Sequence, residues 1–323
     1  MITYILKRLL GMIPMMIGIT FLTAVVMSFL PGGPIEQMTS LNPKVSPEVR
    51  ERLRQQLHLD KPLPVRYVKW LNDLAHFNLG VSIKDNRPIS QKIAEHLPKT
   101  ILLSGLSLLL AFVLAVPIGL FSAIKHNTLC DRALTVFVFL GFSIPTFWLA
   151  LLLMIAFGIH LGWFPITGFR SVLADEMSRF GQILDVARHL ALPLIVTGLT
   201  SLAGLSRYMR NGMLEVIRQD YIRTARAKGL SEKRVIFVHA LKNTLIPLVT
   251  IVGLSIPGLI SSSVILETIF SYPGIGRLTY EAIVSRDLLL VMGTVTMAAF
   301  LTLLGNLVAD VGYALTDPRI RYR

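Results

Sequence analysis

Long apolar runs dominate this chain, and shorter polar segments separate them. A helix rises about 1.5 Å per residue, so about 20 apolar residues cross the roughly 30 Å hydrocarbon core of a bilayer. Six runs reach about that length, and each predicts one membrane-spanning helix. They cover residues 9–30, 100–124, 133–159, 190–208, 245–269 and 288–314. The pattern therefore predicts an all-α polytopic membrane protein with six transmembrane helices.

Prolines interrupt several of these runs. The run at 190–208 is the shortest and contains Pro193, while Pro117, Pro145 and Pro257 lie in three others. Neighbouring helices restore the hydrogen bonds that a proline removes from a span, so all six predictions stand.

The segment at 31–99 is too polar for lipid, yet parts of it have a helical pattern. Proline and glycine at 31–34 end the first run, and Ser46-Pro47 is typical of a helix start. Apolar residues then recur every four positions, at Val49, Leu53 and Leu57. A second amphipathic stretch has its apolar residues at Val68, Leu71, Leu74 and Ala75. We expect a small, mostly helical extracytoplasmic insert that rests on the mouth of the bundle. The alternative is an amphipathic loop that lies on lipid headgroups.

Composition points to the membrane independently of the runs. Of the 323 residues, 53% are hydrophobic and 16% are charged, whereas soluble domains are about a quarter charged. The formal net charge is +13, and an excess of basic residues is also typical of nucleic-acid-binding proteins. Those proteins gather basic residues on one face of a soluble domain, whereas here they lie between apolar runs. We therefore expect contact with membrane lipid and no nucleic acid.

The distribution of Lys and Arg predicts the orientation of the spans. With the N-terminus in the cytoplasm, the inner segments carry 16 of the 32 basic residues and the two short outer loops carry 5. The others lie in the 31–99 segment, and long segments cross membranes largely regardless of charge. Both termini are therefore expected in the cytoplasm. The first run is longer than a signal-peptide core and lacks a cleavage site, so we expect a retained anchor.

The common catalytic and metal-binding patterns are missing from the chain. It has one cysteine, Cys130, and its seven histidines never lie three or four residues apart. It has no phosphate loop of the G-x-x-x-x-G-K-[ST] type, and Gly204–Tyr208 lacks the last glycine of a nucleophile elbow. We expect no catalytic residue, no metal and no bound cofactor, and we do not expect an enzyme.

Few residues qualify for a translocation path or gate. Glu267 and Asp310 are the only acids in the predicted spans, and each lies near a span end. An acid inside a span indicates function by default, yet near an interface it can also reach headgroup water. Small polar residues recur in the spans, where most of them favour close helix packing. Pro145 and Trp148 in the third span fit a gate, and ordinary helix packing explains them equally well. The candidates for path or gate are Ser143, Pro145, Trp148, Ser262, Glu267 and Asn306.

A basic loop at 209–244 separates the fourth and fifth runs. Asp220 is a good N-cap for two helical turns over Tyr221–Lys228, and Gly229 suits the residue after the helix. Ser231 can cap a second helix that runs to about Asn243, ahead of the next span. The pattern predicts a compact knob that docks a cytoplasmic partner. The alternative is a set of charges that only fixes topology.

The segment from Arg223 to Gly229, R-T-A-R-A-K-G, resembles the cytoplasmic "EAA" loop of ABC importer permeases. Arg223 takes the place of the glutamate, as in the peptide/nickel subfamily. Further stretches resemble that subfamily in the same order, and coverage is nearly end to end. They are Leu30–Pro34, Leu79–Ser82, Ser143–Trp148, Leu161–Pro165, Glu267–Arg277 and Asp317–Arg321.

The resemblance implies a transmembrane subunit of an importer in the inner membrane of a bacterium or archaeon. It would pair with a second, related permease and with two ATPase subunits, which would bind the ATP and Mg. An extracytoplasmic binding protein would deliver a di- or oligopeptide, or alternatively a nickel chelate. A self-contained secondary transporter is the alternative from another class, and it would need ion sites near the midplane.

The resemblance also implies that the loop helix couples the permease to an ATPase. Its docking surface would include Arg223, Thr224, Ala225, Ala227 and Gly229, within a coupling loop completed by Asp220, Tyr221, Arg226 and Lys228. The expected organisation is an anchor at 1–30, the insert at 31–99, a core permease domain at 100–316 and a cytoplasmic tail at 317–323.

Overall fold

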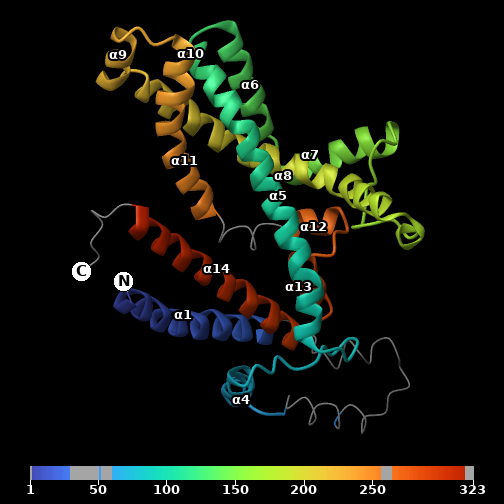
Figure 1. Ribbon diagram of the computed structural model, residues 1–323. Coiled ribbons are helices and arrows are strands. Elements are labelled where there is room, and N and C mark those ends of the chain that lie inside the picture. The colour runs from blue at the N-terminus through green and yellow to red at the C-terminus, as the bar shows by residue number, and fades with distance from the viewer. Residues whose placement is uncertain (1, 30–50, 52–59, 256–263, 317–323) are drawn as a thin grey trace. The chain divides into compact units, whose positions relative to one another are not determined.

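The computed structural model describes residues 2–29, 51, 60–255 and 264–316 (Figure 1). Helices make up nearly all of the regular structure in these ranges, and Val81 and Pro88 form an isolated β-bridge. The all-α fold class is confirmed. The principal helices are α1 (Ile2–Phe29), α4 (Leu63–Ala75), α5 (Ile89–Ile124), α6 (Leu129–Ser143), α7 (Thr146–Leu153), α8 (Arg179–Val216), α9 (Asp220–Ala227), α11 (Leu241–Ser255), α12 (Val264–Ile269), α13 (Ile275–Val284) and α14 (Leu288–Thr316).

Among the described residues, five helices are long and apolar enough to cross a membrane, or six if one bent pair is a single span. The pair is α6 and the helix Thr146–His160, which meet at an angle of 100°. The run at 133–159, which predicts one spanning helix, therefore holds two helices with a sharp bend between them, and it gives the sixth span only if the bent pair crosses as one. Proline restricts the residue before it to extended backbone. Ile144, which precedes Pro145, has φ −79° and ψ 126° and ends α6.

Other span boundaries also differ from the sequence pattern. Helix α5 begins at Ile89 rather than near 100, and α8 extends the predicted 190–208 span at both ends. The fifth run contains two helices, α11 and α12, and residues 256–263 between them lie outside the described residues. The apolar run alone does not reveal these ends, because amphipathic turns continue the helices beyond it.

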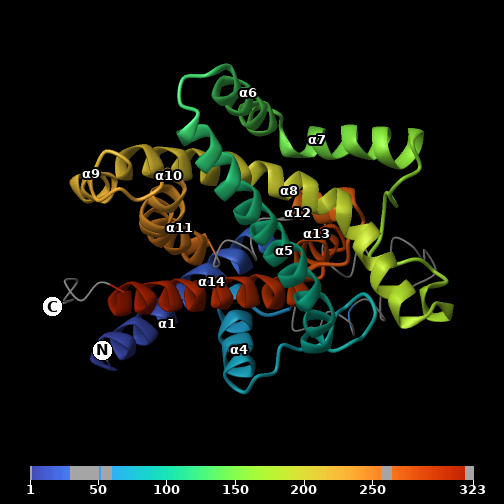
Figure 2. The same cartoon turned by 45° about the horizontal axis from the view of Figure 1, so that its top comes forward.

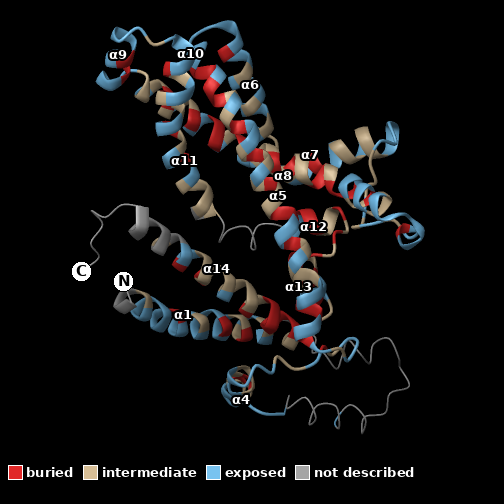
Figure 3. Ribbon diagram, in the orientation of Figure 1, coloured by how far each residue is buried: buried red, intermediate tan, exposed pale blue. Residues whose placement is uncertain are grey.

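The described chain divides into two compact units, each with its own core. The first consists of residues 1–100, 260–268 and 273–323, and the second of residues 101–259 and 269–272. In the first unit, α1 packs along α14, as Figures 1 and 2 both show. Asp310 of α14 accepts a hydrogen bond from Arg8 Nε of α1 at 2.9 Å, so this intramembrane acid has a basic partner. Much of α1 is exposed, and its exposed residues are largely apolar, as a lipid-facing helix requires (Figure 3).

Helix α4 confirms the second amphipathic stretch of the insert but corrects its buried face. Tyr67 and Trp70 are buried, whereas Val68 is 64% exposed. The Tyr67 hydroxyl donates to the Ile17 carbonyl at 2.8 Å and lies 2.8 Å from the Thr20 hydroxyl, both on α1. The insert therefore packs on the first span through aromatic residues. The helix expected after Ser46 lies outside the described residues.

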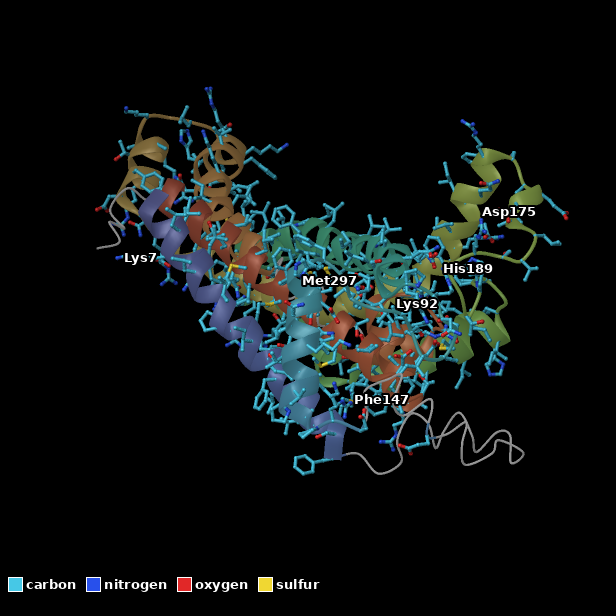
Figure 4. The ribbon with its side chains drawn as sticks, turned by 90° about the horizontal axis from the view of Figure 1, so that it is seen from below. Lys7, Lys92, Phe147, Asp175, His189 and Met297 are labelled. Atoms are coloured by element: carbon cyan, nitrogen blue, oxygen red, sulfur yellow. The ribbon has the colours of Figure 1, made fainter. Side chains whose placement is uncertain are left out.

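A buried polar cluster fastens the end of the insert to α14. Asp287 accepts hydrogen bonds from the Ser82 hydroxyl at 2.6 Å and from the Ile83 N–H at 2.9 Å. Lys92 of α5 (Figure 4) donates to Ser82 at 3.2 Å and to Asp85 at 2.8 Å. The Leu79–Ser82 stretch therefore attaches the insert to the start of α14.

The second unit contains most of α5 together with α6, α8, α9 and α11. Its core includes Leu202, Met209 and Met213 of α8 and Leu248 of α11. Gly119 permits close contact of α5 and α8, because a Cβ there would lie 2.6 Å from the Met209 Cβ. In the segment before α8, the Ser171 N–H donates to Asp185 at 2.7 Å, and buried His189 (Figure 4) lies one turn farther along α8.

Candidate functional site: the loop helix between two spans

Along the chain, helix α9 (Asp220–Ala227) follows α8 and precedes the long helix that begins at Glu232. In space, α9 lies beside the first turns of that long helix (Figures 1 and 2). Two of its side chains are buried, Ile222 fully and Ala225 at 8% exposure. Both belong to the core of the second unit. The rest of α9 is exposed (Figure 3). The helix thus has one face attached to its own chain and one free face.

The start of α9 differs from the prediction by one residue. Gln219 is the N-cap, and Asp220 is the first helical residue. An acid in the first turn still favours the helix, because it lies near the positive end of the helix dipole. Asp220 also lies 3.4 Å from Arg223, but both side chains are highly exposed, and such pairs stabilise little.

The end of α9 is a Schellman turn centred on Gly229. The Leu230 N–H donates to the Ala225 carbonyl at 3.4 Å, and the Gly229 N–H donates to the Arg226 carbonyl at 2.9 Å. Gly229 has φ +77°, which side chains with a Cβ resist. An added Cβ would meet no atom within 4 Å, so backbone conformation alone selects glycine here.

A bidentate ion pair closes the turn. Arg226 donates to Glu232 through Nε at 3.1 Å and through Nη2 at 2.6 Å. The hydrogen bonds to this carboxylate raise the pKa of Arg226. This pair joins the end of α9 to the first turn of the following helix.

The second helix of the expected knob is the beginning of a span. Ser231 is its N-cap residue, as predicted, although its side chain makes no capping hydrogen bond. The helix does not end near Asn243. It continues through α10 (Glu232–Arg234), the π-helix Val235–Ala240 and α11, and Pro247 lies inside it. Asn243 Nδ2 donates to the Tyr221 hydroxyl at 2.9 Å, so a side-chain hydrogen bond joins α9 to this helix.

The structure exposes most of the predicted docking residues but not all of them. Ala225 points into the core and is not available to a partner. Sequence reasoning also missed Ile222, although its spacing of three from Ala225 marks one helix face. The exposed members are Asp220, Tyr221, Arg223, Thr224, Arg226, Ala227, Lys228 and Gly229.

The gate candidates do not form one site in the described residues. Ser143, Pro145 and Trp148 are exposed at the bend between α6 and α7, and the Ser143 hydroxyl donates to its own helix at Phe139. Asn306 is exposed on α14. Ser262 lies outside the described residues.

Glu267 is fully buried and is held by a glycine-rich turn. Its carboxylate accepts hydrogen bonds from the Thr100 hydroxyl at 2.8 Å and from the Arg277 N–H at 2.9 Å. A Cβ on Gly274 would lie 2.2 Å from Oε1, and one on Gly276 would lie 2.9 Å from Oε2. Glu267 therefore anchors the start of α13 rather than facing a water-filled path.

Acids, histidines and cysteines are dispersed in the described part of the chain, where no three of them gather as metal ligands.

Comparison with known proteins decides the family. Residues 115–322 match the family described as binding-protein-dependent transport system inner membrane component, and residues 1–104 match its N-terminal region. The chain belongs to this family. It is thus a multi-pass permease of the inner membrane and a subunit of an ABC transporter complex.

Curated relatives match this permease over its whole length. It is 42% identical over 323 residues to the oligopeptide transport system permease protein AppB of Bacillus subtilis (strain 168), with 100% of both chains covered. It is 39% identical to the di/tripeptide transport system permease protein DppB of Pseudomonas aeruginosa (strain UCBPP-PA14), again with 100% of both covered.

A solved structure shares the fold of the permease. A chain of the MetNI methionine ABC transporter in an inward-facing conformation has a TM-score of 0.50 and 17% identity. The match covers 69% of this chain and 96% of that chain. At this identity the likeness concerns the fold alone.

Proposed function

We propose that this permease forms the path of an ATP-driven importer of di- or oligopeptides. An extracytoplasmic binding protein delivers the cargo, and a second, related permease completes the path. The names of the two curated relatives above favour peptides over a nickel chelate. A secondary transporter is not favoured, because the two acids of the sequence-predicted spans, Glu267 and Asp310, have hydrogen-bonding partners within the chain.

The observation that carries the proposal is the free face of α9. A helix this short rarely persists alone in water. Here Ile222, Ala225, the Schellman turn and the Arg226–Glu232 pair hold it in place. The outer residues Arg223, Thr224, Ala227 and Lys228 then form a preorganised surface for an ATPase subunit.

Movement of α9 reaches the spans through the core of the second unit. Ile222 and Ala225 share that core with Met213 of α8 and Val235 of the next long helix. Two partner ATPases bind ATP and Mg, and their closure displaces α9 together with these helices. The displacement exchanges inward- and outward-facing states, as in other interface-driven transitions. In this scheme the permease itself hydrolyses no ATP, and both termini lie in the cytoplasm.

Gly229→Val tests the coupling. At φ +77° the substitution costs about 1–2 kcal/mol and displaces the end of α9. We expect insertion and complex assembly to persist while labelled-peptide uptake per ATP hydrolysed falls at least ~10-fold in proteoliposomes. Gly229→Asn is the matched control, because asparagine tolerates this conformation, and it retains most of the uptake.

Two results would contradict the proposal. Normal uptake by Gly229→Val would reduce the loop to a topological anchor. Uptake by the purified chain on an ion gradient, without ATPases, would identify a secondary transporter.

A further inference from the structure

The second unit contains a cavity of about 340 Å³ between α5, α6 and α8, here called the α6–α8 pocket. Its lining includes Thr135, Phe139 and Phe142 of α6 and Gly204, Arg207 and Arg210 of α8. Gly204 leaves space in the lining, because a Cβ there would meet no atom within 4 Å. No role proposed above uses this pocket.

The pocket has a basic end and an apolar end. Helices α6 and α8 run antiparallel, since Asp131 contacts Arg210, and a Cβ on Gly141 would lie 3.8 Å from the Leu199 Cβ. Arg207 and Arg210 therefore lie near the start of α6, and Phe139 and Phe142 lie toward its other end. The cavity thus suits a ligand with a charged head and an apolar body.

The net charge of the basic end comes from Arg207. Arg210 donates to Asp131 through Nε at 3.0 Å and through Nη2 at 2.8 Å, and Asp131 is 2% exposed. That charge is neutralised. Arg207 is exposed, and no acid in the described ranges forms an ion pair with it. An anion in the pocket meets one uncompensated guanidinium.

The basic end lies at the level of the turn between α5 and α6. The backbone N–H of Asn127, in that turn, donates to Asp131 at 3.0 Å, which fixes the turn beside Arg210. In the orientation proposed above, this turn is at the cytoplasmic membrane surface. Anionic lipids concentrate in that leaflet, and basic pockets between spans on that side bind their headgroups.

We propose that the α6–α8 pocket binds an anionic phospholipid of the cytoplasmic leaflet. Arg207 binds the phosphate, and an acyl chain lies along Phe139 and Phe142. The inference rests on the proposed orientation. It adds a ligand that the transport function alone does not require, held between two helices of the unit that includes α9.

Lipid retention by the complete transporter tests the proposal. The complex, with its ATPases and second permease, is incubated with phosphatidylglycerol vesicles, purified and examined by native mass spectrometry. Arg207→Gln removes the charge, and Gly204→Phe fills the cavity. We expect Arg207→Gln to retain phosphatidylglycerol about tenfold less than the parent, as the loss of one charge-assisted contact predicts. Gly204→Phe also retains less, because its side chain occupies the space of the lipid. Phosphatidylcholine retention stays unchanged in Arg207→Gln.

Arg132→Gln is the control, because Arg132 is exposed near the same end of α6 but does not line the pocket. Unchanged retention in both pocket variants, or equal loss in the control, overturns the proposal. A Gly204→Cys variant that cross-links to the second permease also overturns it, because a protein then fills the pocket. Since Arg207 lies outside α9, ATPase co-purification and coupled uptake are scored separately, and a negative lipid result leaves the transport function standing.

Discussion

A buried carboxylate is stable only when hydrogen bonds replace its lost water. Glu267 meets this condition through Thr100 and the backbone of Arg277, and Gly274 and Gly276 allow the turn to approach it. The same side chain was a gate candidate on sequence grounds. The sequence pattern puts it in the fifth predicted span, whereas the structure puts it in the short helix α12, outside the candidate spans. Its surroundings depend on residues far apart in the chain.

Gly274→Ala should destabilise the permease. The added methyl group would overlap the Glu267 carboxylate, with Cβ 2.2 Å from Oε1, and overpacking of this kind costs about 1–3 kcal/mol. We expect a lower midpoint of thermal unfolding for the purified protein in detergent. Gly105→Ala serves as control, because a Cβ there meets nothing within 4 Å. Equal midpoints for the two variants would show that the Glu267 turn relaxes freely.

Replacing Glu267 probes the same anchor from the other side. Glu267→Gln keeps the size of the side chain but weakens its acceptance from Thr100 and the Arg277 N–H, which costs about 1–3 kcal/mol. The expected result is a lower unfolding midpoint with normal cargo selectivity. Altered selectivity at an unchanged midpoint would return Glu267 to the translocation path.

Among the helices, the bend between α6 and α7 is the largest departure from the sequence pattern. An apolar run records which residues avoid water but not the direction of the helix. Pro145 was visible in the sequence, and its effect depends on whether neighbouring helices keep the span straight. The exposed Ser143 and Trp148 at the bend keep it a candidate gate.

Pro145→Ala should straighten this bend. Val136 and Ile155 are both exposed, and spin labels there in a Cys130→Ser background report their separation. A continuous α-helix would separate the two Cα atoms by about 28 Å, and the 100° bend brings them closer. We expect the distance to increase in Pro145→Ala. An unchanged distance would assign the bend to packing rather than to proline.

The whole chain behaves as two packed units that share α5, of which Ile89–Thr100 belongs to the first and Ile101–Ile124 to the second. The insert shares a buried cluster with α1 and α14 in the first unit. In the second unit, α9 packs on the π-helix Val235–Ala240 and shares a core with α8. If both ends of the chain are cytoplasmic, the insert is extracytoplasmic and α9 is cytoplasmic.

Cysteine labelling tests this topology. In a Cys130→Ser background, Phe77→Cys follows α4 in the insert and Arg223→Cys lies on α9; Phe77 is 94% exposed, and the Arg223 side chain is 74% exposed. A membrane-impermeant maleimide applied to intact cells should label Phe77→Cys and leave Arg223→Cys unlabelled until the membrane is permeabilised. The reverse pattern would place α9 outside the cell and remove its access to cytoplasmic ATPases.

Apolar runs, charge bias and the local motif around Gly229 determined the fold class, the membrane location and the position of α9. These features are local, because hydrophobicity, caps and glycine turns act over a few residues. The burial of Glu267, the continuous helix through Pro247 and the α6–α8 pocket were decided only by tertiary structure. Each depends on contacts between residues distant in sequence, which no local pattern records.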